Sequence, residues 1–221
     1  MTPDDPEVAY YREIERAFVE RRGDPLFISN ADWVFLAKLR RRGIPQRIVL
    51  RGIADAFDAH AHSFSRKQKI RSLSFCEGEI TAAVARFRRA HRADGDPRRD
   101  LGEALLKLEA RIGALPAVEG LSPALDEARE RLRAIAEQFE GEPSFDVGPA
   151  LNVVEDALYE AVSTVLGTEA LRTFENDSRE ATSSFKSRMP DGVYETLIAE
   201  SIRRKALQHF GLPRLLLAEV E

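Results

Sequence analysis

Apolar residues recur every three or four positions along most of this 221-residue chain, and this is the period of an amphipathic α-helix. In the first such segment the apolar positions are Val8, Tyr11, Ile14 and Phe18. No strand-like alternation of apolar and polar residues extends beyond four positions, and no internal repeat stands out. The sequence therefore predicts an all-α fold.

Glycine, proline and capping residues indicate where the N-terminal helices begin and end. The first helix is expected to end near Gly23, and Ser29 or Asn30 can cap a second helix. Gly43 can adopt the left-handed conformation that closes this second helix, and Pro45, with its φ already fixed, can begin a third. We therefore expect a tight helix–helix corner at this Gly-Ile-Pro step.

A change in composition separates two predicted domains. A fourth helix is expected to carry Ile70, Leu73, Ile80, Val84 and Phe87. The stretch HRADGDPRRD follows it and combines Gly, Pro and charge with no apolar anchor, as a linker does. We predict a compact N-terminal helical domain at residues 1–93, a linker at 94–100 and a second helical bundle at 101–221.

The second domain ends in the unusual tail FGLPRLLLAEVE. The last helix is expected to end at Gly211, after which proline forces an extended start. Two alternatives remain open: the tail folds back onto the helices, or it docks on a protein partner. The candidate partner-binding residues are Leu212, Pro213, Leu215, Leu216 and Leu217.

Charge is divided unevenly along a chain whose net charge is −4. Residues 1–99 hold 20 Lys and Arg against 14 Asp and Glu, whereas the remainder holds 13 against 23. Between Lys38 and Arg92 the count is 14 basic to 4 acidic residues. A concentrated positive segment on an acidic protein suggests an anionic partner. The alternatives are that the acidic half neutralises this segment, or that the charges are solvated helix faces.

Two basic groups are the candidate nucleic-acid-binding residues. Arg40, Arg41, Arg42, Arg47 and Arg51 flank the corner, and Arg66, Lys67, Lys69 and Arg71 precede the predicted fourth helix. In a compact bundle the two groups are expected on neighbouring surfaces. Arginine suits phosphate oxygens because its planar guanidinium donates two parallel hydrogen bonds. A third basic patch, RFRRAHR at residues 86–92, lies at the C-terminal end of the predicted fourth helix. The helix dipole favours positive charge there, which is enough to explain these arginines, so we treat the patch as a secondary candidate.

The first eighty residues resemble a known family. The stretch YYREIERAFVERRGDPLFISNADWVFLAKLRRRGIPQRIVLRGIADAF, followed by KIRSLSF, looks like the C-terminal DnaD-like domain of bacterial and phage replication-initiation proteins. The matching positions are Tyr11, Phe18, Ser29, Trp33, Leu36, Gly43, Val49, Ile53, Ala56, Ile70 and Leu73. The resemblance implies a shared helical fold, and DNA contact near the Ile70–Ser74 region.

The sequence offers little support for catalysis or for metal binding. Asp58, His60 and His62 lie close together, but on a helix residues two apart point in nearly opposite directions. The carboxylates Glu155, Asp156, Glu160 and Glu175, beside Tyr159, are spaced like a charged helix face. The two glycine-rich motifs that bind nucleotide phosphates, G-x-x-x-x-G-K and G-x-G-x-x-G, are both absent from the sequence. We therefore expect no enzyme activity, no metal and no cofactor.

Cysteine content and hydropathy favour a cytoplasmic protein. The single cysteine, Cys76, has no internal partner for a disulfide and is expected to be a buried, inert thiol. No apolar run approaches the roughly 18–20 residues that span a bilayer, and no secretory signal is predicted.

These patterns lead to two functional hypotheses. The first is a non-enzymatic nucleic-acid-associated protein, a DNA-binding accessory subunit of a larger complex, whose contacts do not depend on base sequence. The second is a helical adaptor or scaffold whose arginines meet an acidic protein partner, without nucleic-acid contact. Salt dependence of binding to random DNA separates the two, because phosphate contacts release counterions.

Overall fold

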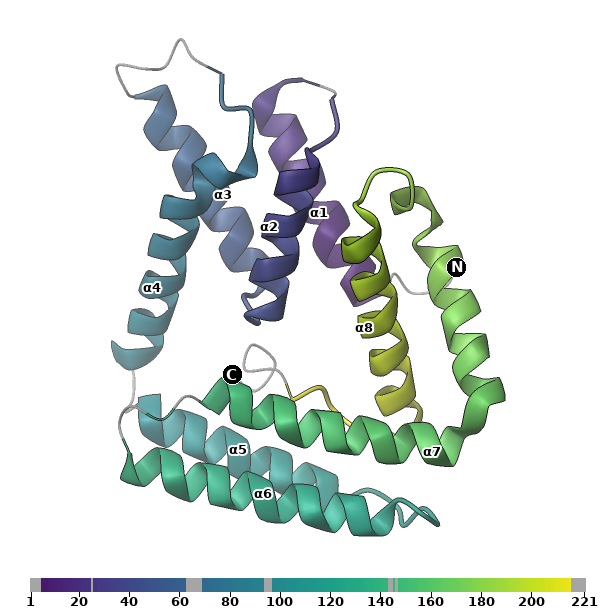
Figure 1. Cartoon of the computed structure of the whole chain (residues 1–221). Helices are drawn as coiled ribbons and strands as arrows, with labels where there is room; N and C mark the ends of the chain where they lie inside the picture. Colours follow the sequence, from purple (N-terminus) through teal and green to yellow (C-terminus); the bar gives the residue numbers. More distant parts are fainter. Residues whose placement is uncertain are drawn as a thin grey trace. The chain divides into compact units, whose positions relative to one another are not determined.

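The computed structural model describes residues 5–24, 26–62, 69–93, 97–142, 145 and 147–215, with the backbone alone for 88–93 and 97–100. It confirms the all-α fold, since the described residues form helices and no strand (Figure 1). The helices are α1 (Pro6–Arg22), α2 (Asn30–Arg41), α3 (Gln46–Ala61), the 3-10 helix η1 (Leu73–Cys76), α4 (Glu77–Ala93), α5 (Pro97–Gly113), α6 (Ser122–Gly141), α7 (Val147–Ala181), the 3-10 helix η2 (Ser183–Phe185) and α8 (Asp191–His209). None of these helices, over the described residues, is both long and apolar enough to cross a membrane.

The chain divides into two compact units that are not continuous in sequence. The first unit comprises Met1–His91 and Arg179–Ile198, and the second comprises Arg92–Ser178 and Ala199–Glu221. The predicted domains were 1–93 and 101–221 with a linker at 94–100. The units differ from them in two places, since 179–198 belongs to the first unit and the second unit begins at Arg92. By sequence the first unit holds 20 basic against 15 acidic residues, and the second 13 against 22.

The ends of α1 and α2 follow the capping residues in the sequence. Asp5 accepts a hydrogen bond from the Glu7 N–H at 2.9 Å at the start of α1, and Gly23 ends that helix with φ 68°. Ser29 and Asp32 form a reciprocal capping box at the start of α2. Asp32 also accepts the N–H of Leu73 at 2.7 Å. One buried carboxylate therefore caps α2 and fixes the segment that leads into η1.

The fourth predicted helix begins later than the sequence indicated. Ile70 lies in a non-helical segment that ends in extended backbone at Ser72, Leu73 opens η1, and α4 starts only at Glu77. Ile70 and Leu73 are nevertheless buried, at 5% and 0% exposed. Periodicity placed these residues correctly in the core but wrongly in a helix, because a chain held by Asp32 can bury side chains without helical hydrogen bonds.

The turn between α7 and α8 completes the core of the first unit. Phe185 is fully buried and meets Trp33 edge-on, with ring centroids 5.7 Å apart. Arg188 donates to the buried Glu15 at 2.8 Å. Burial raises the pKa of Glu15, although Arg188 opposes that shift. Two buried side chains in this turn leave almost no periodic signal in the sequence.

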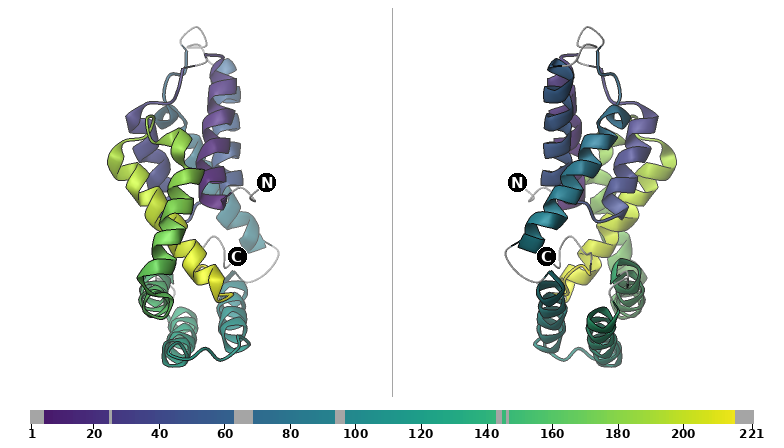
Figure 2. Two further views of the ribbon diagram at one scale, coloured as in Figure 1. Left: turned by 90° about the vertical axis from the view of Figure 1, so that its right-hand side faces the viewer. Right: turned by 90° about the vertical axis from the view of Figure 1, so that its left-hand side faces the viewer.

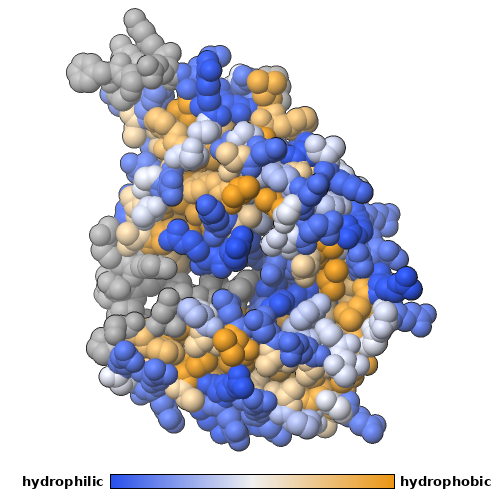
Figure 3. All heavy atoms as spheres, in the orientation of Figure 1, coloured by the Kyte–Doolittle hydropathy of each residue, from blue (hydrophilic) through white to orange (hydrophobic). Residues whose placement is uncertain are grey.

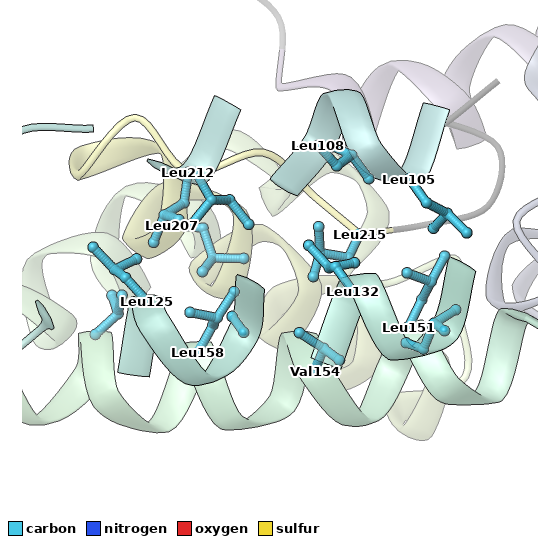
Figure 4. Close-up of a cluster of buried hydrophobic side chains, with 14 of the residues drawn as sticks. Leu105, Leu108, Leu125, Leu132, Leu151, Val154, Leu158, Leu207, Leu212 and Leu215 are labelled. Atoms are coloured by element: carbon cyan, nitrogen blue, oxygen red, sulfur yellow. The ribbon is translucent and has the colours of Figure 1, made fainter. Parts of the chain in front are cut away.

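Helices α5, α6, the first part of α7 and the end of α8 form the core of the second unit. Figure 2 shows α5, α6 and α7 nearly end-on as neighbouring helices. Leucines from all of these helices meet in one cluster (Figure 4). Helix α7 is broken at Gly167, whose φ of 73° and ψ of 173° belong to a region that is essentially restricted to glycine.

Candidate nucleic-acid interface

The corner between α2 and α3 is the tight turn that the sequence predicted. Gly43 has φ 65°, its N–H bonds to the Arg40 carbonyl at 2.9 Å, and the Ile44 N–H bonds to the Leu39 carbonyl at 3.1 Å. This pair of hydrogen bonds is a Schellman motif, which satisfies the last carbonyls of a helix. Leu39 and Ile44 are buried beneath it, at 3% and 4% exposed. The corner is therefore held rigidly from within the first unit.

Arg40 belongs to the fold rather than to the exposed surface. Its guanidinium bonds to both carboxylate oxygens of Glu7, with Nε to Oε2 at 2.8 Å. It also lies 5.2 Å from the ring centroid of Tyr10. The Arg40 side chain is only 13% exposed and that of Glu7 only 2%. The structure thus separates Arg40 from the other candidate nucleic-acid-binding residues, because a buried carboxylate on α1 lies within its reach.

Arg41, Arg42 and Arg47 are exposed on either side of the corner. None of the three forms an ion pair with another described residue. Arg47 lies over the ring of Phe87 on α4, with its guanidinium carbon 5.1 Å from the ring centroid. Figure 3 shows hydrophilic side chains gathered where α2 ends and α3 begins. The first turn of α3 contains no acidic residue, so nothing there offsets this positive charge.

Arg51 and Arg86 share one carboxylate across α3 and α4. Arg51 Nε lies 2.9 Å from Asp55 Oδ1, and an Arg86 nitrogen bonds to Asp55 Oδ2. The Arg51 side chain is 73% exposed and that of Arg86 is 48% exposed. Sequence analysis placed Arg86 in a secondary patch and did not associate it with the corner.

A glycine in α3 explains why Arg86 reaches this surface. A Cβ added to Gly52 would lie 2.4 Å from the Cα of Ile80, so α3 and α4 touch backbone to backbone there. Such a close approach brings side chains of α4 beside those of α3. In the sequence, a glycine inside an otherwise aliphatic helical run could have indicated this close contact between two helices.

The second basic group does not lie beside the corner. Lys69 and Arg71 are exposed, and they follow the end of α3, whereas the corner precedes its start (Figure 1). Sixteen helical residues separate the two ends, or about 24 Å at 1.5 Å per residue. The expected neighbouring surfaces are therefore not formed. Arg66 and Lys67 lie outside the described residues.

His60, His62 and Cys76 lie in aromatic, backbone and core contacts, respectively. His60 packs edge-on against Phe75 at 5.5 Å, and His62 Nδ1 lies 2.7 Å from the Asp58 carbonyl oxygen. Within the described ranges no three His, Cys, Asp or Glu residues come together to hold a metal ion. Cys76 is fully buried, and burial, with Asp32 nearby, raises the pKa of its thiol to about 12.

One carboxylate of α7, that of Glu155, stabilises the C-terminal tail. Glu155 is 3% exposed and accepts hydrogen bonds from Arg214 Nε at 3.0 Å and from the Leu215 N–H at 2.5 Å. Arg214 also bonds to Glu200 at 2.7 Å. A buried carboxylate that is bound by a guanidinium and a backbone amide has a structural role.

The tail follows the fold-back alternative as far as it is described. Leu212 and Leu215 are 5% and 0% exposed, and both point into the leucine cluster of the second unit (Figure 4). Pro213 is half-buried between them. These buried leucines are covered by their own helices and present no surface to a partner. Leu216 and Leu217 lie outside the described residues.

Comparison with known proteins gives a match for the N-terminal segment. A family model described as an uncharacterised protein matches residues 9–96. No curated protein and no solved structure matches the chain. The resemblance to a DnaD-like domain is therefore wrong, since the model that covers this segment is a different one. The positions that suggested it, such as Trp33, Leu36 and Val49, are buried core residues, and many small helical bundles need apolar residues at such spacings.

Proposed function

We propose that this protein is a non-enzymatic nucleic-acid-associated protein that binds DNA through the corner arginines, as an accessory subunit of a larger complex. The observation that carries the proposal is the contrast within one short stretch. Arg41, Arg42 and Arg47 are exposed without a carboxylate partner among the described residues, whereas Arg40 is bound by Glu7. Guanidinium groups without a carboxylate partner on a rigid turn are suited to phosphate oxygens.

The charge of the first unit supports the same proposal. This unit has five more basic than acidic residues, although the whole chain is acidic. A local positive field attracts a polyanion, and contacts to phosphates confer affinity without base recognition. The proposed surface therefore binds the phosphate backbone and is not selective for sequence.

A charge-removal variant tests the proposal. Changing Arg41, Arg42, Arg47 and Arg51 together to Gln retains long polar side chains and removes four charges. Affinity for a random DNA duplex should fall, and the slope of log affinity against log salt should shrink by up to about four phosphate contacts. Fluorescence anisotropy over a salt series measures both quantities.

The matched control removes the same number of charges from the second unit. Lys107, Arg111, Arg131 and Arg172 are exposed there, and their change to Gln should leave the slope unchanged. Absence of DNA binding by the wild-type protein at low salt would overturn the proposal and favour an adaptor that meets an acidic protein. An equal loss of DNA affinity in the corner variant and in this control variant would also overturn the proposal, because binding would then depend on net charge alone.

A further inference from the structure

We propose that Arg86 is a further residue of this binding surface, and that Asp55 holds Arg51 and Arg86 in the position where a backbone phosphate displaces it. The inference rests on the proposed function. It adds a second helix, α4, to the binding surface, and it identifies Asp55 as a carboxylate that competes with phosphate for the two arginines. Arg51 and Arg86 come from different helices, and both donate to the same carboxylate. A site where two guanidinium groups converge on one anionic group has the donors that a phosphate requires.

Three of the charged residues of α3 lie in one stripe. Arg47, Arg51 and Asp55 are spaced four residues apart, so they follow one face of the helix. Arg47 at one end of this stripe contacts Phe87, and Asp55 at the other contacts Arg86, the preceding residue on α4. The stripe therefore follows the seam between α3 and α4 and continues the corner surface.

The Asp55 contacts are suited to exchange with a ligand. The Arg51 side chain is 73% exposed and that of Arg86 is 48% exposed, so water competes for both pairs. Ion pairs of this exposed kind contribute little to stability. Asp55 itself is 21% exposed, which leaves its carboxylate open to displacement. By contrast, Glu7 is 2% exposed beneath Arg40 and is not displaceable in this way.

Removing the carboxylate should strengthen binding. In Asp55→Asn, both guanidinium groups become available, and we expect affinity for a random DNA duplex to rise about fivefold, with a salt slope steeper by about one to two contacts. Asp58→Asn is the control, because Asp58 is exposed on the same helix and forms no ion pair with a described residue. It removes an equal charge and should change affinity by less than about twofold.

Removing the arginine should have the opposite effect. Arg86→Gln should weaken binding about fivefold and make the salt slope shallower by about one contact. In the double variant with Asp55→Asn, the gain from the asparagine should be smaller than in the wild-type background, because only Arg51 remains to be released.

The outcomes separate this inference from the proposed function. Suppose that the four-arginine variant of the corner loses DNA binding while Arg86→Gln and Asp55→Asn bind DNA with wild-type affinity. The proposed function of the corner then stands, and the extension of the binding surface to α4 is wrong. If Asp55→Asn and Asp58→Asn strengthen binding equally, Asp55 acts only through its charge and the displacement is wrong. If the wild-type protein binds no DNA, both the proposed function and this inference fail.

Discussion

Arg41 and Arg214 are the same side chain in two opposite environments. Arg41 ends α2, is exposed and forms no ion pair with a described residue. Arg214 follows α8, is 6% exposed and lies between Glu155 and Glu200. Burial lowers the pKa of Arg214, but the two carboxylates outweigh this effect and raise it. The difference shows that an arginine serves the fold where a buried carboxylate is within reach and remains available to a ligand elsewhere.

The same distinction separates neighbours in the corner. Arg40 and Arg41 are adjacent in sequence, yet only Arg40 faces α1 and its buried Glu7. Successive helical residues point about 100° apart, so adjacent arginines reach different surroundings. A basic run in a sequence therefore combines structural and accessible charges, and the helix register divides them.

The largest effect is expected from removing the buried arginine of the second unit. Arg214→Leu should lower the free energy of unfolding by about 3–5 kcal/mol, because Glu155 would stay buried with only the longer ion pair to Arg203, at 3.7 Å. Urea denaturation followed by circular dichroism measures the loss. Arg131→Leu is the control, since Arg131 and Glu127 form an exposed pair that contributes about 0–1 kcal/mol. Equal losses in the two variants would mean that Glu155 finds another partner and that the tail is not anchored by Arg214.

A smaller effect is expected within the corner, where two neighbouring arginines can be compared directly. Arg40→Gln should cost about 2–4 kcal/mol, because Glu7 would lose its main partner while staying buried. Arg41→Gln should change the free energy of unfolding by less than about 0.5 kcal/mol. The same denaturation experiment applies to both. If the two variants are equally stable, the division of the corner into structural and accessible arginines is wrong.

The smallest of the three effects concerns the contact that places Arg86 beside the corner. Gly52→Ala should destabilise the protein by about 1–3 kcal/mol, because its Cβ would meet the backbone of Ile80. Gly78→Ala, near the start of α4, has open space around its Cβ and should stabilise by up to about 1 kcal/mol. Thermal unfolding gives the sign of each change. A neutral Gly52→Ala would show that α3 and α4 do not pack this closely.

Much of the local structure could be predicted because it depends on short-range effects. Gly43 was expected in the left-handed region because it must close α2 before Pro45, and it has φ 65°. Ser29 was expected as a cap and forms the capping box with Asp32. The start of α4 was predicted wrongly, because the tertiary hydrogen bond from Leu73 to Asp32 holds the preceding segment extended.

The amino-acid sequence by itself determined the all-helical fold, the capped ends of α1 and α2, and the excess of positive charge between Lys38 and Arg92. Periodicity, capping and net charge depend only on residues near one another in the chain. The tertiary structure alone decided which arginines pair with distant carboxylates, because Glu7, Asp55 and Glu155 meet Arg40, Arg86 and Arg214 across 31 to 59 positions of sequence. It also placed Phe185 against Trp33. Such pairings depend on how helices pack, and no local pattern records them.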